Sequence, residues 1–264
     1  MIVLLGAACT GAPTSAAPHP PRNVFLIVME NHSPDEVLDS PFTASLAARY
    51  GVAANYHAIT HPSVPNYLAL TSGQTWGVRD DGYYKLPTTD IGHQLSGAGV
   101  SWRAYMEGLE PAACLDSPAP YEVRHNPFAY YGGQCPSNVV PLTNLDSDLA
   151  SGASRFSWIT PDTCHDTHDC SVSVGDQWLR QEVGAIMHSR AWSSNGVLFI
   201  TWDEDDYSAD DNRVLTLVIA PGMKHKVSQQ SYTHYSLLAT IEDLMGVSRL
   251  ARAAQAQPMR DLLP

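Results

Sequence analysis

Two pairs of oxygen-bearing side chains follow apolar runs that have the character of buried strands. Glu30 and Asn31 come directly after residues 23–29, and Asp203 and Glu204 come directly after residues 196–202. Ligands of open α/β sheets bind beyond the carboxyl ends of the strands, so we expect both pairs at one edge of a sheet. Carboxylate and amide oxygens predict a divalent metal site, with Ca²⁺, Mg²⁺ or Mn²⁺ favoured over Zn²⁺. The alternative for the second pair is a solvated loop, because six of the nine residues 203–211 are acidic.

A serine at the start of an expected helix is the candidate nucleophile. Ser63 stands between Pro62 and Pro65, directly before a helical pattern at 65–72. A hydroxyl at a helix N-terminus lies beside unpaired backbone N–H groups and the positive end of the helix dipole, which favour an incoming phosphate. The alternative role for Ser63 is that of a simple N-cap, which is common for serine.

Buried strands and helices alternate along the chain, and this alternation predicts an α/β fold, a three-layer sandwich with a mostly parallel central sheet. The expected strands are the apolar, β-branched runs at 23–29, 100–106, 155–160, 196–202 and 213–220. The expected helices are residues 34–49, 65–72, 89–96, 173–189 and 234–245. Ser33 to Glu36 has the pattern of a capping box with Pro34 at the first helical position, and Thr233 and Gly246 bracket the last helix.

The cysteines indicate a chain that is exported to an oxidising compartment. Apart from Cys9, the chain has an even number of cysteines, and local pairing predicts bonds between Cys114 and Cys135 and between Cys164 and Cys170. A zinc site is the competing interpretation, but no Cys-X-X-Cys spacing is present. Residues 107–142 show no clear period and read as an insertion in a single domain that extends over residues 23–264.

Residues 1–22 read as an export signal and a Pro-rich linker, with an apolar part too short for a transmembrane span. Cleavage before Cys9 would leave a lipid-anchored protein on the cell envelope, whereas cleavage after Ala16 or Ala17 would release a secreted one. The formal net charge is −12 and no basic run exists, which argues against nucleic-acid binding.

Five motifs in a fixed order make the chain resemble the bacterial phosphoesterase family, which groups secreted acid phosphatases with phospholipases C. They are Glu30-Asn31-His32-Ser33, His61-Pro62-Ser63-Val64-Pro65-Asn66-Tyr67, Asp166-Thr167-His168-Asp169, Thr201-Trp202-Asp203-Glu204 and Thr233-His234-Tyr235-Ser236. The resemblance extends over roughly residues 23 to 262. It implies an alkaline-phosphatase-like fold, and Ser63 to Asn66 looks like the Thr-Phe-Pro-Asn nucleophile turn of nucleotide pyrophosphatases.

The resemblance also implies a role for each motif. The metal would be bound by Glu30, Asn31, Asp203 and Glu204, the nucleophile would be Ser63, and Asn66 would steady a non-bridging phosphate oxygen. His168 and His234 match positions that hold a second metal in the wider superfamily or contact the phosphate or leaving group directly. His125, in His125-Asn126-Pro127-Phe128, also resembles a family motif, and its alternative is a surface-loop histidine.

These residues predict a metal-dependent phosphomonoesterase that works through a phosphoserine intermediate. A protonated His168 or His234 would donate to the departing oxygen. The expected substrate is a small-molecule or lipid-headgroup phosphate ester, including phosphoinositides. One alternative is a phospholipase C-like phosphodiesterase. A second is a metal-independent serine esterase that uses Ser63, Asp203 and His234, although the chain has no G-x-S-x-G motif.

Overall fold

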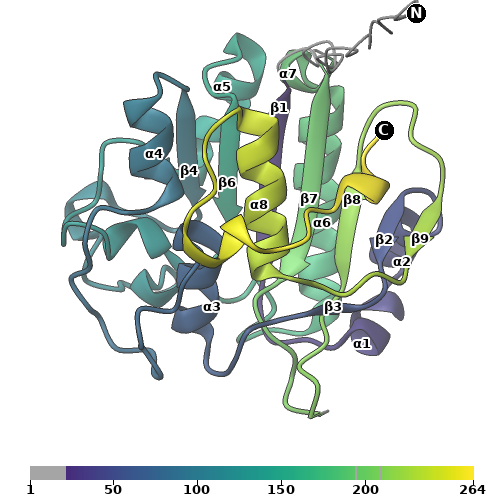
Figure 1. Cartoon of the computed structure of the whole chain (residues 1–264), viewed down its shortest axis with the longest axis horizontal. Helices are drawn as coiled ribbons and strands as arrows, with labels where there is room; N and C mark the ends of the chain where they lie inside the picture. Colours follow the sequence, from purple (N-terminus) through teal and green to yellow (C-terminus); the bar gives the residue numbers. More distant parts are fainter. Residues whose placement is uncertain (1–21, 194, 209) are drawn as a thin grey trace, which may run out of the picture.

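A central eight-stranded sheet organises the computed structural model, which describes residues 22–193, 195–208 and 210–264. The predicted export signal and the Cys9 anchor therefore lie outside the described residues. The strand order is β5-β4-β6-β1-β7-β8-β2-β9, and β3 and β10 form a separate two-stranded sheet. The strand β1, which carries Glu30 at its end, has neighbours on both sides and lies in the middle of the sheet (Figure 1).

All five apolar runs form strands in the main sheet. They are β1 (Asn23–Met29), β4 (Trp102–Met106), β6 (Phe156–Thr160), β7 (Gly196–Trp202) and β8 (Thr216–Ile219). The strands that the sequence did not predict are two or three residues long, which is too short for a periodic pattern to show. They are β2 (Gly51–Ala53), β3 (Tyr56–His57), β5 (Val139–Pro141), β9 (Lys226–Ser228) and β10 (Tyr232–Thr233).

The sheet is mixed but mostly parallel, as predicted. Strand β1 pairs in parallel with β6 and β7, and β4 pairs in parallel with β5 and β6. Strand β8 is the exception, because it runs antiparallel to both β7 and β2. The parallel alignment of β1, β6 and β7 brings their carboxyl ends to one edge, where ligands of such sheets bind.

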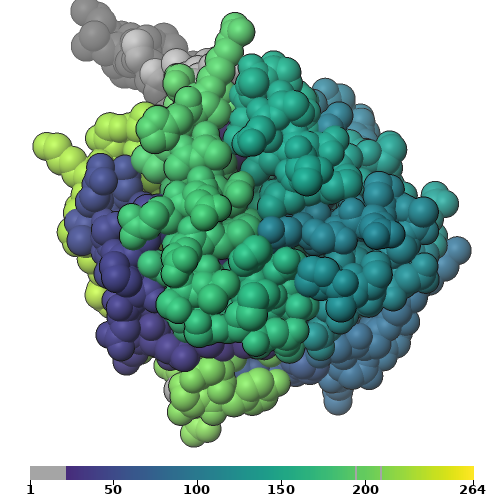
Figure 2. Space-filling view, turned by 180° about the vertical axis from the view of Figure 1, so that it is seen from behind, coloured from purple at the N-terminus to yellow at the C-terminus, as the bar shows by residue number. Residues whose placement is uncertain are grey.

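Helices cover both faces of the sheet and complete the predicted three layers (Figure 1). One face holds α3 (Ser63–Ser72), α4 (Ile91–Gly97) and α8 (His234–Met245). The other face holds α1 (Pro34–Leu38), α2 (Pro41–Ala47), α5 (Leu145–Ser151), α6 (Val172–His188) and α7 (Arg190–Ser193). Figure 2 shows this second face, where the purple residues of the N-terminal helices lie beside the green residues of α6 and α7.

The single helix expected over residues 34–49 is in fact two helices, α1 and α2. Pro41 lacks a backbone N–H and cannot continue a helix, so α1 ends before it and Pro41 instead opens α2. The predicted capping box is also wrong, because the Ser33 side chain caps nothing and Glu36 Oε2 lies 2.7 Å from His32 Nδ1. The boundaries of α8 are confirmed by Thr233 at the N-cap and by Gly246, with φ of 74°, at the C-cap.

The segment 107–142 covers the carboxyl ends of β4 and β6 with little regular structure before its last residues join the sheet as β5. Short 3₁₀ helices occur in and just after it, at Pro111–Ala113, Val123–His125, Pro127–Ala129 and Leu142–Asn144, and two more follow α8 at Ala251–Ala254 and Arg260–Leu262. No helix among the described residues is long and apolar enough to cross a membrane.

Both predicted disulfides are confirmed. Cys114 is bonded to Cys135 at a separation of 21 residues, and Cys164 is bonded to Cys170 at a separation of 6. The first bond closes the segment 107–142, and the second closes the short loop that carries Asp166 and His168. Both bonds therefore fix irregular chain beside the carboxyl edge of the sheet.

Removal of the two disulfides should separate their effects on stability and activity. Loop-closure entropy gives a loss of about 3 kcal/mol in the free energy of unfolding for Cys114→Ser/Cys135→Ser and about 2 kcal/mol for Cys164→Ser/Cys170→Ser. Loss of the second pair should nevertheless reduce the expected phosphoesterase activity more, because its loop holds Asp166 and His168. Urea unfolding and initial rates measure both effects. Equal activity in the two folded double variants would contradict a bracing role for the shorter loop.

Candidate active site

The carboxyl ends of β1 and β7 and the loop after β6 are joined by backbone hydrogen bonds. Glu30 N–H donates to the Asp166 carbonyl at 2.9 Å, and Asp203 N–H donates to the Met29 carbonyl at 2.9 Å. The side chains of Glu30, Asp166 and Asp203 are fully buried. The sheet therefore brings three carboxyl groups from distant parts of the chain to one place.

Asn31 turns the chain away from the sheet directly after Glu30. Its φ of 56° lies in the left-handed region, which asparagine adopts more readily than most residues. Its backbone N–H donates to Asp203 Oδ1 at 3.2 Å, whereas its side-chain Oδ1 is shielded from solvent and has no hydrogen-bond partner. The structure thus brings Asn31 and Asp203 together, as the sequence predicted.

Helix α3 directs two hydroxyl groups at the same carboxylate. Ser63, the first residue of the helix, donates from Oγ to Glu30 Oε2 at 3.1 Å. Tyr67 lies one turn later on the same helix face and donates its hydroxyl to Glu30 Oε1. The Val64 N–H at the helix N-terminus donates to Asp81 Oδ1 at 3.0 Å, so this N-terminus already binds an anionic group.

Asn66 and His61 connect the serine turn to Glu204. The Asn66 amide oxygen accepts hydrogen bonds from the N–H groups of Ile59 and Thr60 at 2.9 and 3.2 Å, which fixes the turn. The Asn66 amide nitrogen donates to Glu204 Oε2 at 3.1 Å. His61 Nδ1 lies 3.1 Å from the same oxygen. Glu204 therefore faces the serine turn.

His125 lies between two of the buried carboxylates. Its Nε2 is 3.4 Å from Glu30 Oε1 and its Nδ1 is 3.0 Å from Asp166 Oδ2. Glu30, His125 and Asp166 each offer one ligand atom, and these atoms lie within 4.8 Å of one another, so this triad could bind a metal ion. The surface-loop alternative for His125 does not hold, because the side chain is 2% exposed.

The donor set fits a hard cation. Asn31 Oδ1 and Asp203 Oδ2 are shielded from solvent without a hydrogen-bond partner, and Asp166 Oδ2 has only the nearby ring of His125; this is costly for polar atoms unless something binds them. Oxygen donors with a single imidazole suit Ca²⁺, Mg²⁺ or Mn²⁺ better than a thiolate-preferring metal. These oxygens belong to the four predicted metal ligands and to the triad of Glu30, His125 and Asp166. Glu30 is a member of both groups.

Burial raises the pKa of every carboxyl group in this cluster. Loss of solvent, followed by repulsion from Asp203 and Asp166, raises the pKa of Glu30 well above its usual range. Burial likewise raises the pKa of Asp203 to about 7, that of Asp166 to about 8 and that of Glu204 to about 10. These carboxyl groups thus hold protons near neutral pH unless a cation takes the place of the protons.

The three candidate histidines lie in different environments. Burial lowers the pKa of His125 to about 3 and that of His234 to about 4, so both rings are neutral near pH 7. His234 is fixed behind the site, with Nδ1 3.0 Å from the Tyr56 hydroxyl and Nε2 2.6 Å from the Asp203 carbonyl. His168 is partly exposed, with Nδ1 2.7 Å from Asp169 Oδ1. The geometry therefore favours His168 over a protonated His234 as the proton donor.

The hydrogen bonds do not form the triad of a serine esterase. Such a triad needs a histidine nitrogen within reach of the serine hydroxyl. Ser63 instead donates to Glu30, and both nitrogens of His234 are engaged by Tyr56 and by the backbone of Asp203. The site is consequently better suited to metal-assisted chemistry than to acyl transfer.

Several residues of the site carried no assigned role in the sequence analysis. Asp166, Tyr67 and His61 lie inside the recognised motifs, and this membership could have indicated that they belong to the site. Arg124 is less predictable: its Nη2 lies 3.4 Å from His168 Nε2, and its Nε is shielded without a hydrogen-bond partner. Asp81 stands 18 residues after Ser63 in irregular chain, and no local pattern in the sequence indicates its contact with α3.

Two features lie beside this site. Glu107, Asp162 and His165 form a second group of close ligand atoms, but they are partly exposed and pair with one another, as in the 2.9 Å contact between His165 Nδ1 and Glu107 Oε2. A cavity of about 520 Å³ borders Thr60 and His61 and is otherwise lined by Ala58, Ile59, Tyr207, Asp210, Asp211 and Asn212. His61 therefore separates a polar cavity from Glu204.

Solved structures of other proteins share this fold. The ectonucleotide pyrophosphatase/phosphodiesterase 5 of the mouse superposes with a TM-score of 0.65 at 10% identity, covering 92% of this chain and 100% of that one. A protein of the alkaline phosphatase superfamily from Vibrio parahaemolyticus superposes with a TM-score of 0.63 at 13% identity, covering 88% of this chain and 68% of that one. These likenesses confirm the alkaline-phosphatase-like fold.

Sequence comparisons identify the family. The chain is 30% identical to the phosphatidylinositol-3-phosphatase of Mycobacterium tuberculosis, covering 98% of this chain and 86% of that protein. It is 23% identical to an acid phosphatase of Aspergillus fumigatus, covering 86% of this chain but 56% of that longer protein. The model of the phosphoesterase family matches residues 27–248. The chain therefore belongs to the phosphoesterase family and is a phosphoric ester hydrolase.

Proposed function

We propose that this protein is a metal-dependent phosphomonoesterase that works through a phosphoserine intermediate. The observation that carries the proposal is the contact of Ser63 Oγ with Glu30, a carboxylate surrounded by oxygen atoms that lack partners. A hydroxyl in this position is buried, starts a helix and faces a candidate cation site. These are the requirements for an activated nucleophile in phosphoryl transfer.

Glu30, Asn31, Asp203 and Glu204 would hold the ion, with His125 and Asp166 beside Glu30 as further donors. A bound divalent ion would lower the pKa of the serine hydroxyl and neutralise charge on the phosphoryl group. Glu30 Oε2 accepts the Ser63 hydrogen bond and is placed to take its proton. As Ser63 Oγ bonds to phosphorus, the ester oxygen leaves, and water later releases phosphate from the serine.

The groups around Ser63 would hold the phosphoryl oxygens. The N-terminus of α3 favours negative charge, which a phosphoryl oxygen would supply in place of Asp81, and the Asn66 amide nitrogen lies on the side of Glu204. Arg124 brings a guanidinium to an otherwise acidic site, and its Nε has no hydrogen-bond partner and lies 3.9 Å from Glu122 Oε2. His168, oriented by Asp169, would give a proton to the departing oxygen, while His234 would hold the Asp203 backbone in place.

The proposed substrate is a phosphomonoester with a hydroxyl-rich leaving group, such as a phosphoinositide head group. One relative is named a phosphatidylinositol-3-phosphatase and another an acid phosphatase, and neither name denotes a diesterase. The polar cavity beside His61, with Asp210, Asp211 and Asn212 in its wall, offers acceptors for hydroxyl groups. The two disulfides support export to an oxidising compartment, either as a secreted or as an envelope-attached protein.

Ser63→Ala should abolish hydrolysis of p-nitrophenyl phosphate and leave the fold intact. The loss should exceed a hundredfold in kcat, the usual effect of removing a nucleophile. Ser45→Ala, an exposed serine on α2, is the matched control and should keep the wild-type rate. The p-nitrophenyl ester of phosphorylcholine, assayed in parallel, distinguishes a monoesterase from a phospholipase C-like diesterase. Retention of more than about a hundredth of the rate by Ser63→Ala would refute the phosphoserine mechanism.

The metal site should respond differently to two substitutions in the same acidic loop. Asp203→Asn removes a buried carboxylate with an unpaired oxygen, so bound metal and turnover should both fall by at least about tenfold. Asp206→Asn changes an exposed side chain three residues later and should alter neither. Elemental analysis and rates with and without chelator provide the measurement. Full activity of metal-free wild type in chelator would contradict the metal mechanism.

The metal-free protein should lose stability as the pH rises from about 6.5 to about 8, above the range in which His125 and His234 titrate in the unfolded chain. Asp203 and Asp166, with pKa values raised to about 7 and about 8, keep protons in the native state that the unfolded chain releases near pH 4. The free energy of unfolding therefore falls with rising pH. Added Mn²⁺ or Mg²⁺ should raise the melting temperature more at pH 8 than at pH 5, because protons compete with the ion. Thermal scans in chelator that show constant or increasing stability over this range would contradict the protonated cluster.

A further inference from the structure

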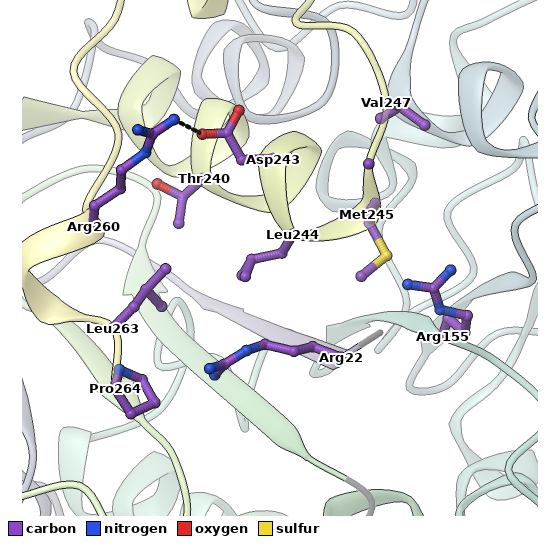
Figure 3. Close-up of a pocket in the computed structure, with 11 residues that line it drawn as sticks. Arg22, Arg155, Thr240, Asp243, Leu244, Met245, Val247, Arg260, Leu263 and Pro264 are labelled. Atoms are coloured by element: carbon purple, nitrogen blue, oxygen red, sulfur yellow. Dashed lines mark hydrogen bonds and ion pairs between the residues drawn. The ribbon is translucent and has the colours of Figure 1, made fainter. Parts of the chain in front are cut away.

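A cavity of about 760 Å³ lies at the amino end of the sheet, away from the candidate active site (Figure 3). Arg22 directly precedes β1 and Arg155 directly precedes β6, and these two strands are parallel neighbours. The end of α8 and the C-terminal residues form the opposite wall. Eight residues separate Arg22 from Glu30 along β1, which is roughly 26 Å at the rise of a strand.

The cavity collects positive charge in an acidic protein. Its described lining contains Arg22, Arg155 and Arg260 but a single acidic residue, Asp243, although the whole chain has a formal net charge of −12. Asp243 is already engaged, because Arg249 binds it with two hydrogen bonds of 2.9 and 2.7 Å and Arg260 binds it at 2.9 Å. No side-chain carboxylate among the described lining residues therefore remains to neutralise Arg22 and Arg155.

Two guanidinium groups of this cavity have donors without acceptors. Arg22 Nη1 and Arg155 Nε are shielded from solvent, and neither has a hydrogen-bond partner. Loss of solvent lowers the pKa of Arg22, as expected for a cation that lacks a counter-charge. Both side chains are partly buried, but one shielded donor atom of each lacks an acceptor, and an anion that binds both would supply it.

The remaining wall is apolar. Leu244 and Met245 at the end of α8, together with Val247 and Leu263, face the arginines across the cavity. Figure 3 shows Arg22 and Arg155 entering from the sheet, opposite Leu244 and Met245. The volume is in the range of small-molecule sites, which combine mostly apolar walls with a few polar groups.

We propose that this cavity, named here the arginine cavity after Arg22, Arg155 and Arg260, binds an amphipathic organic anion. The ligand would have one carboxylate or phosphorus oxyanion, which bonds to Arg22 and Arg155, and one apolar chain, which packs on Leu244 and Met245. The binding is independent of the metal and of Ser63, because the arginine cavity lies at the other end of β1.

Calorimetry with the full chain tests this site directly. Dodecanoate and dodecylphosphonate serve as probes of the two head groups, dodecanol is the uncharged counterpart, and inorganic phosphate is the anion without a chain. Chelator is present throughout, which limits binding of the phosphonate at the active site. We expect at least one of the two amphipathic anions to bind with a Kd below about 1 mM, and neither dodecanol nor phosphate to match it.

Variants assign the binding to the arginine cavity. Arg22→Gln/Arg155→Gln should weaken binding at least tenfold, whereas Lys224→Gln, which removes a positive charge from an exposed site elsewhere, should have no effect. Leu244→Trp, which fills the cavity and keeps both arginines, should also weaken binding tenfold. This variant tests the site even if the double arginine variant fails to fold. Equal affinity for dodecanol, wild-type affinity in the Leu244→Trp or the folded arginine variant, or no binding of either anion would overturn the proposal.

Discussion

The burial of three carboxyl groups at one edge of the sheet is the constraint on which the site depends. Glu30, Asp166 and Asp203 are fully buried and repel one another, and burial of unpaired charges in a protein interior is unfavourable by several kcal/mol per ion. Ser63 and Tyr67 donate hydrogen bonds to Glu30, which offsets part of this cost. The oxygens that remain without hydrogen-bond partners account for the rest of this unfavourable free energy of burial. Either protons or a cation can reduce it. The same feature would therefore destabilise the metal-free cluster and would give the proposed site its affinity for metal.

The fold holds these groups together through its most regular part. Strand β1 is hydrogen-bonded on both sides by parallel strands. These hydrogen bonds fix the end of β1 and therefore the position of Glu30, which follows it. The loop that carries Asp166 is irregular, but it is closed by a disulfide and bonded to Glu30 through the backbone. Gly175 on α6 lets this loop pack closely, since a Cβ there would lie 3.0 Å from the His165 carbonyl oxygen. This irregular loop can hold candidate catalytic groups in fixed positions because regular strands and helices surround it.

The sequence predicts the parts of this structure that have a local pattern. Buried strands such as 23–29 and 196–202 are continuous apolar runs, so their positions and the acids at their ends can be read directly. The direction of a strand cannot be read in this way, because the run 213–220 is as apolar as the parallel strands of the sheet, yet β8 is antiparallel to both of its neighbours. The contact between His125 and Asp166 joins two irregular segments 41 residues apart, and no periodicity encodes it. His234 shows a third limit: its motif predicts proximity to the site, but only the hydrogen bonds reveal that both its nitrogens are engaged.

Helix α8 extends from the candidate active site to the arginine cavity. The positive charge of the arginine cavity nevertheless contributes little to phosphate binding at the candidate active site. The first residue of α8, His234, supports the Asp203 backbone, and the last turn of the helix lines the arginine cavity. Its 12 residues extend about 18 Å. Arg22 is farther still from the site, roughly 26 Å from Glu30 along β1, and Coulomb attraction of a phosphate at Ser63 over such a distance is weak. In the proposed mechanism, affinity for phosphate comes from groups at the carboxyl edge itself: the N-terminus of α3, Asn66, Arg124 and the proposed cation. Because the first three bring a single formal positive charge among several acids, the proposed cation would be the main attraction of this edge for a phosphate ester.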